Sequence, residues 1–94
     1  MLKNDFKKIV EGKKLFIVTF TKKDGTERVM EATIDMNKIP TDDHPAPKEM
    51  TEEMYIEWKA KDDASPYLNV YDLEKGQWRK VNIETVTSLL VKYI

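Results

Sequence analysis

The sequence predicts a mainly β domain in which five short antiparallel strands form a small barrel behind a short N-terminal helix. Three observations lead to this fold class. The chain has 94 residues, a length that suits one hydrophobic core, so we expect a single domain over 1–94. Two segments carry β-branched and alternating apolar side chains around turns that contain glycine. All four prolines lie between positions 40 and 66, so an irregular middle segment separates the two.

Residues 1–12 predict the helix. Apolar side chains recur there at helical spacing, at Leu2, Phe6, Ile9 and Val10. Lysines occupy other positions of the same segment. Gly12 is suited to end the helix, because glycine readily adopts the left-handed conformation found at helix C-termini.

Residues 14–34 predict the first hairpin. Residues 15–21 form a β-branched and aromatic run that is too short for a helix of ordinary length. Residues 22–25 follow with an Asp-Gly pair, whose tolerance of positive φ angles suits a tight turn. On the return strand, apolar and polar side chains alternate over Met30, Glu31, Ala32, Thr33 and Ile34.

Residues 67–94 predict the second hairpin and the last strand. The expected order is a strand at 67–72, a turn at 73–76, a return strand at 77–83, a one-turn connector at 83–86 and a final strand at 87–93. Closing such strands into a barrel would remove exposed sheet edges.

Residues 35–66 form an acidic, proline-containing insertion between the second and third strands. Residues 30–64 carry 10 acidic and 4 basic side chains, whereas residues 1–29 carry 4 acidic and 8 basic ones. The secondary structure of 48–60 stays open at this point. Met50, Met54 and Trp58 have the spacing of one helix face, but the segment around Tyr55 could equally be extended.

The composition argues against an enzyme. There is no cysteine, and His44 is the single histidine, so we expect no catalytic residue, no cofactor and no metal site. The acidic insertion lacks the ligand spacing and the central glycine of a calcium loop. No apolar run has the roughly 20 residues of a membrane span, and no signal sequence is recognisable. We therefore expect a cytoplasmic protein without a membrane partner.

Two stretches resemble a known family. Residues 20–28, read as F-T-K-K-D-G-T-E-R, and residues 70–79, which end in Trp78-Arg79, are similar to hairpins of the small WYL-like, Sm/SH3-barrel proteins of tailed phages. Ser65-Pro66-Tyr67 resembles the opening of the third strand in those proteins, and residues 83–86 would form the turn that leads to the last strand. The resemblance covers roughly 14–34 and 65–91. It implies an Sm/SH3-like barrel and a phage accessory protein that acts in the infected bacterial cell.

The leading hypothesis is a non-enzymatic phage accessory protein that binds and modulates a host protein during takeover or counter-defence. The partner-binding candidates are the apolar residues inside the acidic insertion, because methionine and aromatic side chains are enriched at protein contacts. The alternative, a structural role in which they cap the open end of the barrel, is the favoured interpretation of these four side chains taken by themselves. These candidates are Met50, Met54, Tyr55 and Trp58.

Two other functions come from different classes. One is an oligomeric Sm-like barrel that binds a small ligand or nucleotide and self-associates through strand edges such as 89–93. The other is binding of RNA or single-stranded DNA, which ranks lower because the sequence pI is about 5.8. For Trp78, a cross-strand pair with Tyr71 is the favoured interpretation. The candidates for nucleic acid or ligand are Lys22, Lys23, Arg28, Tyr67, Tyr71, Trp78 and Arg79.

Overall fold

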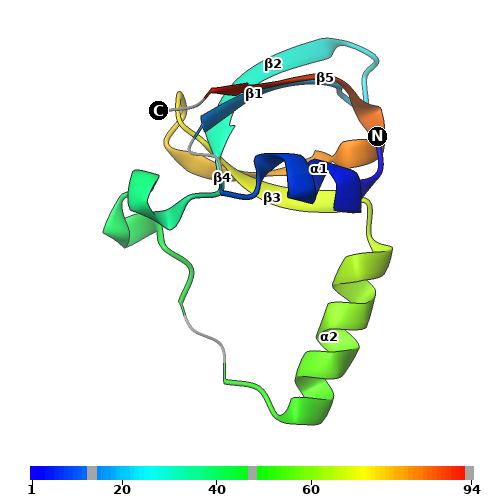
Figure 1. Cartoon of the computed structure of the whole chain (residues 1–94), viewed down its shortest axis with the longest axis vertical. Coiled ribbons are helices and arrows are strands. Elements are labelled where there is room, and N and C mark those ends of the chain that lie inside the picture. The colour runs from blue at the N-terminus through cyan, green and yellow to red at the C-terminus, as the bar shows by residue number, and fades with distance from the viewer. Residues whose placement is uncertain (13–14, 47–48, 93–94) are drawn as a thin grey trace.

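A computed structural model describes residues 1–12, 15–46 and 49–92 of the chain (Figure 1). Residue 14 and residues 93–94, which the predicted hairpins include, lie outside the described residues. The elements are, in chain order, α1 (Lys3–Val10), β1 (Leu15–Thr21), β2 (Glu27–Thr33), the 3-10 turns η1 (Met36–Lys38) and η2 (Thr41–Asp43), α2 (Glu52–Ala64), β3 (Tyr67–Asp72), β4 (Gln77–Asn82), the 3-10 turn η3 (Ile83–Thr85) and β5 (Val86–Lys92).

The five strands form one antiparallel sheet in the order β4-β3-β2-β1-β5. This confirms the predicted fold class, and α2 lies in the predicted insertion between the second and third strands. The expected closure is incomplete, because β4 and β5 are the two edges of the sheet and do not pair with each other in the part of the chain that the structure describes. The three-residue turn η3 links them directly, and it sends Ile83 into the core rather than continuing the strand.

The turn of the first hairpin differs from the expected Asp-Gly geometry. Gly25 has φ +86°, but Asp24 keeps a negative φ angle. The N–H of Gly25 donates to the oxygen of Lys22 (2.9 Å), and the N–H of Lys22 donates to the oxygen of Thr26 (2.7 Å). The loop is therefore one residue longer than a two-residue turn, and only its glycine needs the left-handed region.

Helix α1 packs its Phe6 and Val10 into the core, as the periodicity predicts. The ring of Phe6 meets that of Phe16 edge to face, with centroids 5.6 Å apart. Two members of the predicted apolar stripe are outside the core, since Leu2 is 67% and Ile9 42% exposed. The remaining core side chains come from the strands and η3: Val18, Met30, Ala32, Val70, Val81 and Ile83.

Residue 48 lies outside the described residues, and for 49–60 the open question is settled in favour of a helix that begins later than Met50. Thr51 caps α2 by accepting a hydrogen bond from the N–H of Met54 (3.2 Å), and two glutamates occupy the first turn, where the helix dipole favours negative charge. Pro66 follows the last turn and prevents its continuation. Figure 1 shows α2 projecting away from the barrel. Neither described helix is long and apolar enough to cross a membrane.

Candidate functional site

The outward face of the β3–β4 hairpin carries all three aromatic residues predicted to contact a ligand. Strand alternation puts Tyr67 and Tyr71 on this face, and the register places Trp78 opposite Tyr71 and Asn82 opposite Tyr67. Lys80 shares the face with Trp78 and Asn82. The two ends of this face have different surroundings.

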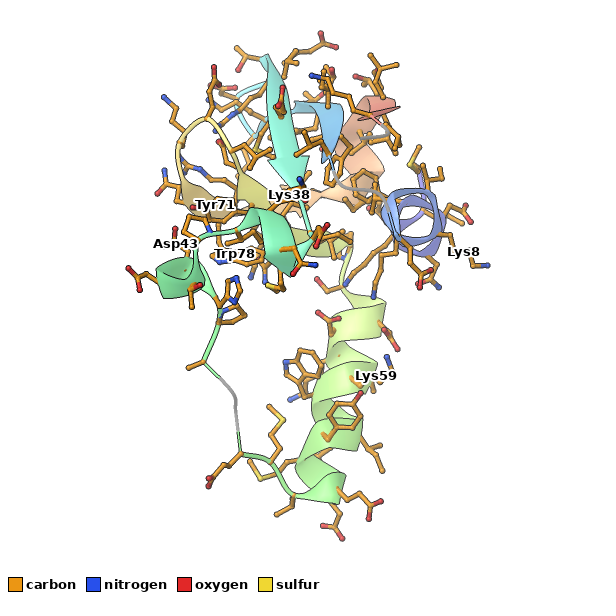
Figure 2. The ribbon with its side chains drawn as sticks, turned by 60° about the vertical axis from the view of Figure 1, so that its left-hand side comes forward. Lys8, Lys38, Asp43, Lys59, Tyr71 and Trp78 are labelled. Carbon is orange, nitrogen blue, oxygen red and sulfur yellow. The ribbon has the colours of Figure 1, made fainter. Side chains whose placement is uncertain are left out.

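The end that carries Tyr71 and Trp78 is covered by the segment that contains Asp43 (Figure 2). The hydroxyl of Tyr71 donates to Oδ2 of Asp43 (2.5 Å), and Nε1 of Trp78 donates to the main-chain oxygen of Asp43 (2.6 Å). The Tyr71 hydrogen bond to the Asp43 carboxylate, together with burial, raises the pKa of the phenol. The two rings are 5.6 Å apart and nearly perpendicular, so the predicted cross-strand pair is confirmed. Tyr71 is 2% exposed and is not available for stacking on a base.

Two predicted cationic residues are engaged with a buried carboxylate. Nη2 of Arg28 donates to Oδ2 of Asp72 (2.7 Å), and Nε of Arg79 lies 4.0 Å from the same oxygen. Asp72 is fully buried, and its Oδ1 also accepts hydrogen bonds from the N–H groups of Glu74 and Lys75 (3.0 Å each). Arg79 does share the inward face of its strand with Val81, as alternation predicts. These contacts give Arg28 and Arg79 a structural role around the turn of the second hairpin.

The other predicted candidates for a ligand are brought together. Lys22 and Lys23 in the first hairpin turn and Tyr67 at the start of β3 line one open cleft of about 280 Å³. Figure 1 shows that this turn lies at the same end of the sheet as η3 and the start of β3. We call this site the basic cleft. Its full lining is Phe20, Thr21, Lys22, Lys23, Tyr67, Lys80, Asn82 and Thr85.

The partner-binding candidates lie on α2 or just before it. Met50 precedes the helix and is partly buried, whereas none of the residues of α2 is buried. The rings of Tyr55 and Trp58 lie side by side on the helix with centroids 6.1 Å apart. Because Met54, Tyr55 and Trp58 are 45–53% exposed, they do not cap the barrel, and that alternative is wrong.

Sequence reasoning missed several residues of these sites. In the sequence, Asp43 is one of many acidic residues of the insertion and Asp72 is the end of a predicted strand. Their hydrogen-bond partners Tyr71 and Arg28 are 28 and 44 positions away, so no local pattern indicates these contacts. Lys80 could have been found, because a side chain two positions from Trp78 shares its face in a strand. Ile56, which is 64% exposed on α2, lies outside the helical spacing of Met50, Met54 and Trp58, so that spacing does not identify it.

The comparisons with known proteins give one match. The sequence model of the family described as WYL_2, Sm-like SH3 beta-barrel fold, matches residues 10–87, which is most of the chain. No curated protein and no solved structure matches the sequence.

Proposed function

The chain belongs to the WYL_2 family, with its Sm-like SH3 β-barrel fold, and from that premise we propose that it is a non-enzymatic phage accessory protein that binds and modulates a host protein. The contact surface would be the outward-projecting helix α2, and the site of action would be the cytoplasm of the infected bacterium. The phage assignment rests on the similarity of residues 20–28 and 70–79 to hairpins of tailed-phage proteins.

One observation carries the proposal: α2 presents large apolar side chains and buries none of them. Met54, Tyr55, Ile56 and Trp58 are between 45% and 64% exposed. Exposed apolar side chains are ordinary when scattered singly, but four within five consecutive residues concentrate apolar surface on one element. Tyrosine and tryptophan are also the residue types that most often dominate the energy of protein interfaces.

The local signals that form α2 also indicate that it is incomplete without a partner. The helix has 13 residues, a Thr51 cap, an internal ion pair between Lys59 and Asp63 (3.9 Å) and a contact from Lys3 to Asp62 near its C-terminal end. Such contributions are each worth about 1 kcal/mol or less, and an isolated helix of this length is marginal in water. Most helices in proteins gain their stability from a packed apolar face. A groove on a partner would supply that packing to α2.

The single histidine is engaged within its own loop. Nε2 of His44 lies 2.9 Å from the main-chain oxygens of both Met36 and Ile39, so it is used within its own loop. Such local hydrogen bonding fits a binding protein better than an enzyme, because a catalytic histidine needs a positioned nucleophile or acid beside it.

The proposal is tested by affinity capture from bacterial host lysate with three forms of the full chain: wild type, Trp58→Ala and Lys59→Ala. Lys59 is the matched control, since it is exposed on the same helix but contributes no large apolar surface (Figure 2). We expect a reproducible host protein with wild type and Lys59→Ala, and its loss with Trp58→Ala. Recovery of the same proteins by all three forms would count against α2 as the contact surface.

A further inference from the structure

We propose that the basic cleft is an anion site for a nucleotide unit, presented either as a free nucleotide or within a single-stranded nucleic acid. The cleft lies in the barrel, between the end of β1, the start of β3, the end of β4 and η3. It shares no lining residue with α2, so this activity is separate from the host-protein contact proposed above.

The charge of the cleft is the first argument. Lys22, Lys23 and Lys80 approach it from two elements that are distant in sequence, and no carboxylate belongs to its lining. Among the residues that the structure describes, none of these three lysines forms an ion pair. The ion-paired cations are all elsewhere: Lys3, Arg28, Lys59, Arg79 and Lys92.

The acidic group that adjoins the two turn lysines in sequence does not line the cleft. Asp24 follows Lys23 in the hairpin turn, and its Oδ1 accepts hydrogen bonds from the hydroxyl (2.6 Å) and the N–H (3.0 Å) of Thr26. These bonds, with a smaller contribution from the charge of Lys22, lower the pKa of Asp24. The carboxylate is held toward Thr26, which immediately precedes β2.

The second argument is the aromatic surface inside the cleft. Tyr67 is the one member of the predicted aromatic trio that the Asp43 segment leaves uncovered, and Nζ of Lys80 lies 6.0 Å from the centroid of its ring. A tyrosine face stacks on any base, while a neighbouring lysine contacts the phosphate. A simple inorganic anion has no aromatic face that could stack on the Tyr67 ring.

Two polar groups that line the cleft can recognise a base or sugar. Oδ1 of Asn82 accepts from the N–H of Glu84 (3.0 Å), which leaves its NH₂ group to donate to a ligand. The hydroxyl of Thr85 donates to the main-chain oxygen of Asn82 (2.8 Å) and can still accept. Cations, an aromatic face and a few polar groups together are the chemistry of a nucleotide site.

Two other clefts are larger than the basic cleft but lack this combination. One, of about 360 Å³, has Lys7 and Lys8 but also Glu11, and no aromatic side chain lines it. The other, of about 380 Å³, is lined by Glu31 and Glu74 and by no cation or aromatic side chain. Glu31 is paired with Lys92 across the outer face of the sheet (3.3 Å). Neither cleft therefore offers cations without a carboxylate together with an aromatic face.

The test measures binding of the full chain to fluorescein-labelled (dT)12 by anisotropy and to AMP by calorimetry. If three lysines contact the phosphates of a single strand, the logarithm of affinity should fall with the logarithm of salt concentration with a slope of about −2. The variant Lys22→Ala/Lys23→Ala/Lys80→Ala should lose roughly tenfold or more in affinity. Its charge-matched control is Lys8→Ala/Lys38→Ala/Lys75→Ala, three exposed lysines outside the cleft.

A second variant separates base stacking from charge. Tyr67→Leu should weaken (dT)12 by about fivefold or more, but it should leave binding of an abasic deoxyribose-phosphate 12-mer unchanged. Binding of (dT)12 without AMP identifies a single strand as the source of the nucleotide unit, and binding of AMP identifies a free nucleotide. Absence of binding to both overturns the proposal, as does equal weakening by the cleft variant and its control. Trp58→Ala should not affect these measurements, so the two proposals fail separately.

Discussion

Nζ of Lys3 donates a 2.6 Å hydrogen bond to the main-chain oxygen of Asp62 and lies 3.6 Å from its carboxylate. Lys3 is 8% exposed, although sequence periodicity places it outside the apolar stripe of α1. The last carbonyls of a helix lack intrahelical partners and carry the negative end of its dipole. The first turn of α1 therefore holds the last turn of α2, and the other end of α2 extends away from the barrel (Figure 1).

This contact predicts how α2 responds to loss of the lysine. Lys3→Met keeps the length of the side chain but removes the charge and the donor, so the end of α2 loses its attachment. We expect α2 to loosen while the barrel stays folded, at a cost of about 1 kcal/mol. Hydrogen exchange of the amides of 52–64 should accelerate with Lys3→Met and not with Lys8→Met. Unchanged exchange in α2 would show that the attachment lies elsewhere.

Asp72 is predicted to be a major stability determinant of the barrel. Asp72→Asn removes the charge that Arg28 faces, at a position with no exposure. Because Arg28 retains partial contact with solvent, we expect a loss of about 2 kcal/mol, below the full cost of an uncompensated buried charge. Urea unfolding measures it, with Asp42→Asn as the exposed control, which should change stability by less than about 0.5 kcal/mol. Equal midpoints for the two variants would exclude the structural role of Asp72.

The hydrogen bond between Tyr71 and Asp43 predicts that the free energy of unfolding depends on pH in the alkaline range. The Asp43 carboxylate raises the pKa of its phenol in the folded protein, so the folded state holds this proton more tightly than the unfolded chain does. The resulting stabilisation is complete below the unfolded pKa of about 10 and is lost as pH rises through the higher folded value. The difference in unfolding free energy between wild type and Tyr71→Phe should therefore shrink above about pH 10. A difference that stays constant from pH 8 to pH 11 would be inconsistent with the Tyr71–Asp43 bond.

The strands and the two hairpins were largely predictable because their signals are local. Alternation and a glycine-containing turn define each hairpin within about 20 residues, and the 3-10 connector follows from the short link before β5. The missed contacts join residues that are far apart in sequence. Asp43 covers Tyr71 and Trp78 from the insertion, and nothing in the order of residues indicates which face that insertion lies against. The contact of Lys3 with Asp62 was also missed, because its partner is distant in sequence and a lysine in the first turn of a helix is usually exposed.

The sites were predictable in part for the same reason. Lys22, Lys23 and Tyr67 were recognised by residue type, but their meeting with Lys80 in one cleft depends on how the two hairpins pack. Arg28 and Arg79 carry the same chemistry as those lysines and turn out to face Asp72. Residue type identifies a group that can bind an anion, while the fold decides whether a carboxylate of the same chain already occupies it.

The most direct test of the central claim is site-specific photo-crosslinking of the full chain inside a bacterial host. A benzophenone amino acid replaces Lys59, which is exposed on α2 beside Trp58, in one form and Gln77, which is exposed at the start of β4, in the other. Our account predicts a discrete adduct with one host protein from position 59 and none from position 77. The same adduct from both positions, or an adduct only at twice the mass of the chain, would contradict α2 as the surface that binds a host protein.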